Sequence, residues 1–371
     1  MRQARSKVGK SIYIGAMTGT SCDAIDISFV SINKTIQLEF FHSARMPKKT
    51  QTEIKDLIAS NKISLSALGE INKDIGEMYS KSIEKAILLS GIPIKDIAGI
   101  ALSGQTVRHE MNRGKGFSLQ LGDPSIVASK IHVPVVDNLR AMNIAVGGQG
   151  APLVPEFHKN IFYKKNTKRL ILNIGGIANF TYIKNKSEFF GSDLGPGNAL
   201  MDAYCQKKLD MPFDRNGSIA SKGEVVLDDL KKLLSLKFFR EPFPKSTGKE
   251  LFNYNLIPET LRCRSPKDAL ATLTEFTAKS ISIGIEKNAL GPKEIIICGG
   301  GVKNKFLLER IKKNTSLKIV SSMNEGYNPQ AIESMAFAWL GYRRLKNISS
   351  VVFAGNNSIK KSLLGSVTKI K

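Results

Sequence analysis

The sequence predicts an α/β fold made of two lobes that are built alike and enclose a ligand cleft. Short apolar segments alternate with helical patterns along the 371 residues. A run of three strands that contains a polar turn, followed by alternating helices and strands, occurs twice. The link at 137–155 is rich in glycine and proline, which is typical of a hinge. We therefore expect one lobe at 1–136 and the other at 137–371.

The expected elements follow from apolar periodicity. For the first lobe they are strands at 11–15, 25–32 and 37–42, two helical pieces within 55–89, a strand at 97–102, a helix at 124–130 and a strand at 133–136. For the second lobe they are strands at 169–174, 177–183, 188–192 and 294–298, with helices at 199–208, 224–234, 267–287, 304–313 and 330–345. The tail at 347–371 is polar, with one short strand expected at 351–353 and room to pack back on the first lobe.

Composition and charge exclude several classes of protein. The 55 Lys and Arg residues exceed the 32 Asp and Glu residues, which gives a net charge of +23. These basic residues are scattered and lack interleaved aromatic residues, so they predict a solvated surface that attracts anionic substrates rather than a nucleic-acid groove. No apolar run is long enough for a membrane helix, the start is too interrupted for a signal peptide, and a cytoplasmic location is expected. The four cysteines and four histidines show neither disulfide nor zinc spacing.

The stretch 191–199, Gly-Ser-Asp-Leu-Gly-Pro-Gly-Asn-Ala, is the strongest local signal for chemistry. It joins an apolar run to a helical pattern, so Asp193 is expected where a strand meets a helix. Such a turn exposes N–H groups and the positive end of a helix, which suits phosphate. A carboxylate there can hold a metal or take a proton from water or a hydroxyl group. Helix capping by Asp193 is the alternative interpretation.

Three glycine-rich turns, at 15–26, 173–179 and 298–304, each follow an apolar strand. Small residues let backbone amides approach a phosphate closely. The three turns and the Asp193 turn, in this order over two similar halves, together predict a nucleotide site. The first turn adds hydroxyl donors and two carboxylates that suit Mg²⁺, directly or through water (Thr18, Thr20 and Ser21; Asp23 and Asp26).

Other familiar site motifs do not occur in the sequence. The segment 246–249, Ser-Thr-Gly-Lys, lacks the leading glycine of a P-loop, no G-x-G-x-x-G opens a helix, and no G-x-S-x-G elbow is present. The polar clusters at 104–109, 119–124 and 147–155 are expected on loops at one end of a sheet. Their amide, hydroxyl and guanidinium groups suit a polyhydroxylated, carboxylated ligand such as a sugar acid. Helix capping by Asp123 and a surface position for Arg108 are the alternatives.

Taken together, these segments resemble the anhydro-N-acetylmuramic acid kinases of bacterial cell-wall recycling, from about residue 13 to residue 364. The motifs that carry the resemblance are MTGTSCDAIDISFV, GQTVRH, LQLGDPSIVA, GGQGAPLVPEFH, LNIGGIANFTYI, SDLGPGNALMDAY, PKSTGKELF, CGGGVKN and AIESMAFAWLG. The resemblance implies two duplicated actin-like, ribonuclease H-like lobes with a central nucleotide cleft. It implies that 1,6-anhydro-N-acetylmuramic acid, ATP and water give N-acetylmuramic acid 6-phosphate and ADP, with Mg²⁺ as cofactor and a homodimer as the assembly.

The resemblance also implies roles for matching residues, with Asp193 as the catalytic base. The residues implied to contact the phosphates and Mg²⁺ are Gly19, Thr20, Ser21, Cys22, Asp23, Ala24, Ile25 and Asp26, with Asp23 and Asp26 on the metal side. The glycines implied to frame the second phosphate turn and the adenosine are Gly175, Gly176, Gly299, Gly300 and Gly301. The residues implied on the sugar side are Gln105, Thr106, Arg140, Gln149 and Glu333.

The sequence departs from the family pattern at three places. Ala24 stands for a usual glycine, Ser103 for a usual histidine and Asn143 for a usual aspartate. These departures leave open a kinase of the same fold that acts on a different amino sugar. The high positive charge leaves open a catalytically idle protein that binds a nucleotide or nucleic acid.

Overall fold

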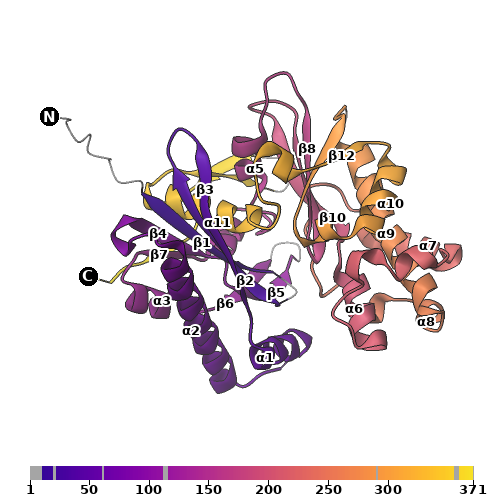
Figure 1. Ribbon diagram of the computed structural model, residues 1–371, viewed down its shortest axis with the longest axis horizontal. Coiled ribbons are helices and arrows are strands. Elements are labelled where there is room, and N and C mark those ends of the chain that lie inside the picture. Colours follow the sequence, from indigo (N-terminus) through magenta and orange to yellow (C-terminus); the bar gives the residue numbers. More distant parts are fainter. Residues whose placement is uncertain are drawn as a thin grey trace.

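The computed structural model describes residues 11–19, 22–60, 62–111, 116–289, 291–354 and 359–370. Two sheets, each covered by helices, form two lobes that lie side by side (Figure 1). The C-terminal segment, yellow in Figure 1, crosses back to the lobe formed by the N-terminal residues. Among the described residues, no helix combines the length and the apolar character needed to cross a membrane.

The first-lobe sheet has the strand order β15-β7-β4-β1-β2-β3. Strands β1, β2 and β3 form an antiparallel meander, and β4 and β7 extend it in parallel. Its strands are β1 (Ile12–Thr18), β2 (Ala24–Ile32), β3 (Ile36–Arg45), β4 (Ile97–Leu102), β7 (Val135–Asp137) and β15 (Ser366–Thr368). The helices of this part of the chain are α1 (Lys48–Ala59), α2 (Leu65–Ser90), α3 (Pro124–Ile131) and α4 (Leu139–Ala145). A separate hairpin is formed by β5 (Gln105–Glu110) and β6 (Phe117–Leu121).

The second-lobe sheet has the order β10-β9-β8-β11-β12. Its strands are β8 (Arg169–Ile174), β9 (Ile177–Ile183), β10 (Phe189–Pro196), β11 (Glu294–Cys298) and β12 (Lys318–Ser321). Its helices are α6 (Ala199–Leu209), α7 (Leu227–Leu234), α8 (Glu259–Arg262), α9 (Pro266–Asn288) and α10 (Lys305–Thr315). In both sheets the strands lie in the order third, second, first, fourth and fifth of their lobe, with the first three antiparallel and the next two parallel. This repeated order confirms the predicted α/β fold of two duplicated lobes.

Three further elements connect the lobes. They are α5 (Pro155–Phe162), α11 (Ile332–Leu345) and the hairpin β13–β14 (Ser350–Phe353 and Ile359–Ser362). Helix α11 packs on β1, β2 and β4, and the tail strand β15 pairs with β7. A Cβ atom at Gly15 would lie 1.9 Å from the carbonyl oxygen of Ser334, so only glycine permits this close approach of strand and helix.

Local sequence explains several of the helix ends. Ser64 caps α2 by accepting a hydrogen bond from the Ala67 amide, and left-handed Gly91 ends the helix. Asp123 accepts from the Ser125 amide and caps α3, so the capping alternative for this residue is what the structure shows. One buried apolar cluster contains Tyr13 of β1, Ile171 of β8 and Trp339 of α11, and therefore belongs to both lobes. This shared core fixes the junction at which the functional groups meet.

The structure differs from the expected elements in three respects. The clusters at 104–109 and 119–124 were expected on loops, whereas β5 and β6 pair as a hairpin that includes most of them. Asp193 lies within β10, which continues to Pro196, and not in a turn after the strand. The tail was expected to contain one strand, but it contains β13, β14 and β15. Short strands with mixed polar composition carry little periodicity, which explains why the sequence did not reveal them.

Candidate active site

Asp193 lies on the buried strand β10 and is 4% exposed. The pairing with β9 shifts by one residue between Asp193 and Gly195, so Leu194 forms a bulge. Such bulges redirect neighbouring side chains, often beside active sites. The Ser246 hydroxyl and the Thr247 amide donate to Oδ2 of Asp193 over 3.2 and 2.9 Å. None of the described residues donates a hydrogen bond to Oδ1, so this oxygen is available to a ligand.

Burial raises the pKa of Asp193 to about 7. The hydrogen bonds from Thr247 and Ser246 and the charge of Arg140 oppose this rise, whereas the carboxylate of Glu250 adds to it. A carboxylate with a pKa near neutrality can both take up and release a proton at physiological pH. The site therefore holds a group suited to general base catalysis.

Arg140 and Glu333 bring opposite charges to the same junction from different helices. Arg140, on α4, donates from Nη1 to the carbonyl oxygen of Gly150 over 3.0 Å. Glu333 lies in the first turn of α11. Burial raises its pKa, although Arg140 and a hydrogen bond with Asn173 oppose this rise. Burial lowers the pKa of Arg140, against the charges of Glu333 and Asp193. Three predicted site residues from separate elements are therefore coupled at one place.

Several buried polar side-chain atoms are unpaired among the described residues. Arg140 Nε, Gln105 Oε1 and Asn179 Oδ1 are buried and have no hydrogen-bond partner among the described residues. Asn179 lies opposite Asp193 in the β9–β10 pairing, on the same face of the sheet. A buried polar atom without a partner costs free energy, so such atoms indicate a place where a ligand supplies the missing hydrogen bonds. One donor and two acceptors suit a hydroxylated, amide-bearing sugar.

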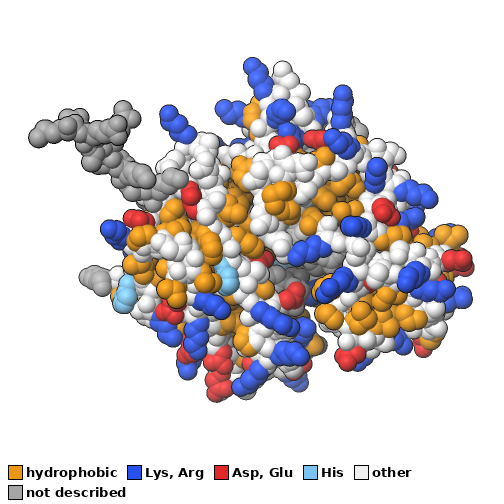
Figure 2. Space-filling view, viewed as in Figure 1, with side chains coloured by type: hydrophobic (Ala, Val, Ile, Leu, Met, Phe, Trp, Pro, Cys, Tyr) orange, Lys and Arg blue, Asp and Glu red, His pale blue; other side chains and the backbone are white. Residues whose placement is uncertain are grey.

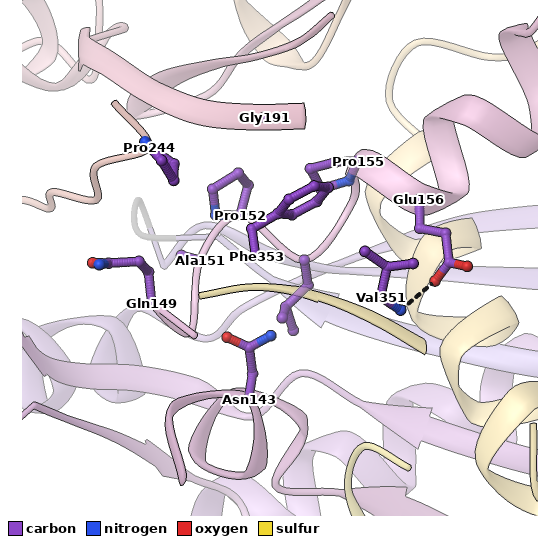
Figure 3. Close-up of a pocket in the computed structure, with 11 residues that line it drawn as sticks. Asn143, Gln149, Ala151, Pro152, Pro155, Glu156, Gly191, Pro244, Val351 and Phe353 are labelled. Carbon is purple, nitrogen blue, oxygen red and sulfur yellow. Dashed lines mark hydrogen bonds between the residues drawn. The ribbon is translucent and has the colours of Figure 1, made fainter. Parts of the chain in front are cut away.

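A pocket beside this group contains Gln149, another predicted sugar-side residue. Figure 3 shows the amide of Asn143 pointing from α4 into the pocket, across from the strand that carries Gly191. Asn143 Oδ1 accepts from the Gly150 amide over 2.8 Å, an interaction that the usual aspartate could also make. Thr106 instead accepts a hydrogen bond from Gln120.

The second and third glycine turns form two close backbone contacts. In the second turn, the carbonyl oxygens of Gly175 and Gly176 accept from the amides that precede and begin α6. In the third turn, a Cβ atom at Gly299 would lie 2.4 Å from Asn173 Oδ1, and the backbone there has a φ of +83°. The next residue, Gly300, has open space where its Cβ would be. The backbone of the third turn is therefore accessible to a ligand on the side of Gly300.

The first turn faces the third turn across the junction. Cys22 is buried, and its amide donates to the carbonyl oxygen of Gly19 over 3.2 Å. Asp26 Oδ1 accepts a hydrogen bond from the Ser43 hydroxyl over 2.6 Å. Burial and the charge of Asp23 raise the pKa of Asp26, and the charge of Lys303 in the third turn opposes this rise. Ala24 and Ile25 begin β2, where Ile25 is fully buried and has only its backbone left for a ligand. The predicted Thr20 and Ser21 lie outside the described residues.

The structure adds two site residues that the sequence analysis did not single out. Burial raises the pKa of Asp202 to about 7, against the charge of Lys249. Burial lowers the pKa of Lys249, against the charges of Asp202 and Asp23. Lys249 therefore reaches from the second lobe toward the first turn. The sequence signal for Lys249 is the motif PKSTGKELF, which lacks the leading glycine of a P-loop and therefore does not by itself predict a phosphate contact.

Figure 2 shows Lys and Arg side chains distributed over the visible face, with a depression where the two lobes meet. This distribution agrees with a solvated basic surface. The duplicated fold, the glycine turns and the buried acid at the lobe junction define the class of the protein as a kinase with a nucleotide cleft.

The comparisons give the family. The family model of anhydro-N-acetylmuramic acid kinase matches residues 11–370. The anhydro-N-acetylmuramic acid kinase of Gamma-proteobacterium EBAC31A08 is 52% identical over 98% of this chain and 100% of its own length. The enzyme of the same name from Vibrio cholerae is 36% identical over 96% of this chain and 98% of its own. The chain belongs to the anhydro-N-acetylmuramic acid kinase family.

A distant likeness in fold also links this chain to a solved structure. A ROK family glucokinase from Streptomyces griseus in complex with glucose and AMPPNP has a TM-score of 0.42 and 11% identity, over 90% of this chain and 99% of that chain. This likeness adds nothing to the topology described above.

Proposed function

We propose that this protein uses ATP and water to convert 1,6-anhydro-N-acetylmuramic acid into N-acetylmuramic acid 6-phosphate. The observation that carries the proposal is Asp193, a buried acid with a pKa of about 7 and one oxygen fixed by two donors. The substrate in this proposal is inferred from the family to which the chain belongs. Asp193 lies opposite Asn179 and within electrostatic reach of Arg140, and the unpaired polar atoms of Asn179, Arg140 and Gln105 suit the hydroxyl and amide groups of the sugar.

The proposed reaction begins with the removal of a proton from water by Oδ1 of Asp193. The water oxygen bonds to the anomeric carbon, the bridge from that carbon to the 6-oxygen breaks, and the 6-oxygen forms a bond to the γ-phosphorus as ADP leaves. Arg140 and Glu333 hold the sugar beside Asp193 and keep the reacting atoms in position. The proton taken up by Asp193 returns to solvent after product release, which a pKa near neutrality permits.

The first turn fits Mg²⁺ bound to ATP. Asp23 and Asp26 provide two neighbouring carboxylates opposite Lys303, and Mg²⁺ is commonly held by one or two carboxylates together with substrate phosphates. Bound there, the ion would reduce the negative charge that develops on the phosphates. We propose that Lys249 and the accessible backbone of the third turn, at Gly300, bind the nucleotide.

The decisive experiment is mass spectrometry of the products formed from ATP, Mg²⁺ and the anhydro sugar in H₂¹⁸O. We expect one ¹⁸O atom at the anomeric carbon of the phosphorylated product, after correction for exchange measured on unlabelled product under the same conditions. Comparison with open N-acetylmuramic acid and N-acetylglucosamine tests a different amino sugar as the substrate. Faster turnover on an open sugar, or phosphorylation without label, would contradict the proposed reaction.

Two properties of the protein in the cell belong to the same proposal. The family resemblance supports a homodimer and a cytoplasmic location, where ATP is available. Light scattering coupled to size exclusion measures the assembly, and fractionation of cells measures the location. A monomer at micromolar concentration, or recovery outside the cytoplasm, would contradict these parts of the proposal without affecting the reaction.

A further inference from the structure

A row of hydrogen bonds connects the hairpin β5–β6 with Asp193 in the second lobe. His109 Nε2 lies 3.1 Å from the hydroxyl of Ser246, which donates to Asp193. His109 Nδ1 lies 3.1 Å from the hydroxyl of Ser118, and Ser118 accepts from the amide of Gln120. Four side chains from three segments of the chain therefore lead to one oxygen of the catalytic acid.

The hydrogen count fixes the direction of this row. The single hydroxyl proton of Ser246 is donated to Asp193, so Ser246 can only accept from His109, and Nε2 must carry a hydrogen. In the neutral ring Nδ1 is then an acceptor, and it receives the hydroxyl proton of Ser118. The amide of Gln120 fits this direction, because it donates to Ser118. Every bond in the row points toward Asp193.

The surroundings of His109 keep its ring neutral and in place. Burial and, to a smaller extent, the positive charge of Arg140 lower the pKa of His109 to about 4. A Cβ atom at Gly150 would lie 3.3 Å from Cε1 of His109, so the glycine leaves room for the imidazole. The charged groups that act on Asp193 are Arg140, from α4, and Glu250, from the segment that follows Ser246.

We infer that His109 is a positioning residue for the proposed reaction: through its Nε2 hydrogen it directs the Ser246 hydroxyl to Oδ2 of Asp193 and leaves Oδ1 for the attacking water. This inference depends on the role proposed for Asp193. A carboxylate with a fixed donor on one oxygen has a defined orientation and a lower pKa than the same buried group without that donor. His109 belongs to the first-lobe part of the chain and Ser246 to the second, so the row is complete only when the hairpin and the 245–249 segment are in contact.

The direct test of the row is the tautomer of His109, measured by ¹⁵N NMR on the full-length protein at pH 7. We expect a protonated Nε2 and an unprotonated Nδ1, and loss of the Nε2 hydrogen-bond signature in Ser246→Ala. A protonated Nδ1 with a bare Nε2, or a doubly protonated ring at this pH, would reverse or break the direction and overturn the inference. This measurement does not depend on turnover, so it remains decisive even if the enzyme fails to act on the anhydro sugar.

The kinetic test compares His109→Phe with His109→Gln. Phenylalanine keeps a ring but removes the donor, so we expect kcat to fall about tenfold and the acidic limb of kcat/KM to move to higher pH, with KM for ATP unchanged. Glutamine restores an N–H donor near the position of Nε2 but cannot titrate, so we expect it to recover most of the rate and the original limb. Equal losses in both variants, with the fold intact by circular dichroism, would overturn a role as hydrogen-bond donor.

A double-mutant cycle with Ser246→Ala separates the row from a purely structural effect. Because both residues act through the same hydrogen bond to Asp193, the double variant should be no slower than the slower single variant. Multiplied losses would show that the residues act independently and would overturn the inference. His132→Asn is the matched control, because His132 is exposed at the end of α3 and has a left-handed backbone that asparagine tolerates.

Discussion

The third strand of each lobe occupies the same place in its sheet, yet the two strands differ in burial. Strand β10 is buried at every residue but one, whereas β3 is exposed or half-buried along its whole length. Each strand is associated with one carboxylate. Asp193 is part of β10, whereas Asp26 is on β2 and lies opposite Ser43 of β3. Duplication of a fold has therefore placed two acids near one junction in different environments.

The cause of this difference is the segment that covers the outer edge of β10. The Asp193 amide donates to the carbonyl oxygen of Lys245 over 3.0 Å, and the Lys245 amide donates to the Ser192 hydroxyl over 2.8 Å. The Lys245 side chain is held in turn by the ring of Phe238, 4.0 Å away, and by its carbonyl oxygen. Among the described residues, no further strand pairs with the outer edge of β3. Covering one edge excludes water from the acid and brings its pKa to the range needed for a base.

Replacing each acid by its amide should have the largest effect and tests the comparison directly. We expect Asp193→Asn to lower kcat by about 10³-fold, because general base catalysis typically contributes 10²- to 10⁴-fold. Asn can still accept the hydrogen bonds from Ser246 and Thr247, so the melting temperature and nucleotide affinity should change little. Steady-state kinetics and calorimetry with ADP measure these quantities.

The matched variant in the other lobe is Asp26→Asn. We expect it to raise the KM for Mg²⁺-ATP by about tenfold, because one of the two carboxylates beside the phosphates is lost, and to change kcat less than Asp193→Asn does. The comparison between the lobes would be wrong if Asp26→Asn removed turnover while Asp193→Asn preserved it.

The pH dependence of the rate should report the buried acid alone. Asp193 acts as a base only when ionised, so kcat/KM should rise with pH and level off above its pKa of about 7. The sign is opposite to that expected for a general acid, which would lose activity over the same range. Asp26→Asn should leave this limb in place, and a limb near pH 4 in the wild type would show that Asp193 is not desolvated as described.

Lys249 tests whether the second lobe contributes a charge to the first turn. We expect Lys249→Met to weaken nucleotide binding by about tenfold or somewhat more, the loss of one charge-assisted hydrogen bond. Without that charge, the pKa of Asp202 should rise further, because Lys249 now lowers it. Isothermal titration of ADP measures the affinity. Lys231→Met, at an exposed position on α7, is the control, and an equal loss there would indicate a general charge effect.

The duplicated architecture could be predicted from the sequence, because strands and helices are recognised from short, continuous patterns of apolar residues. Buried strands such as β8 and β11 appear as continuous apolar segments, and their predicted bounds match the structure. Arg140 and Glu333 were included through the family resemblance, although 192 positions separate them in the chain. The link from His109 through Ser246 to the acid could not be predicted, because it depends on how the hairpin β5–β6 meets a loop more than 100 residues later. Tertiary proximity of polar groups has no periodic signal in a sequence.

The smallest expected effect is that of Lys245 on the free energy of unfolding, and it concerns stability rather than the reaction rate. Burial lowers its pKa to about 8 in the folded protein, whereas an unfolded lysine has a pKa of about 10.4. Between these values the unfolded chain binds more protons than the folded chain, so this group adds stability as the pH rises through that range and loses it as the pH falls to 8. The free energy of unfolding of the wild type, relative to Lys245→Met, should therefore increase from pH 8 to pH 10. Urea denaturation at several pH values measures this difference, with Lys231→Met as the exposed control. A difference that stays flat or falls would mean that the ammonium group is hydrated in the folded protein, and that the aromatic rings do not shield the segment covering the edge of β10.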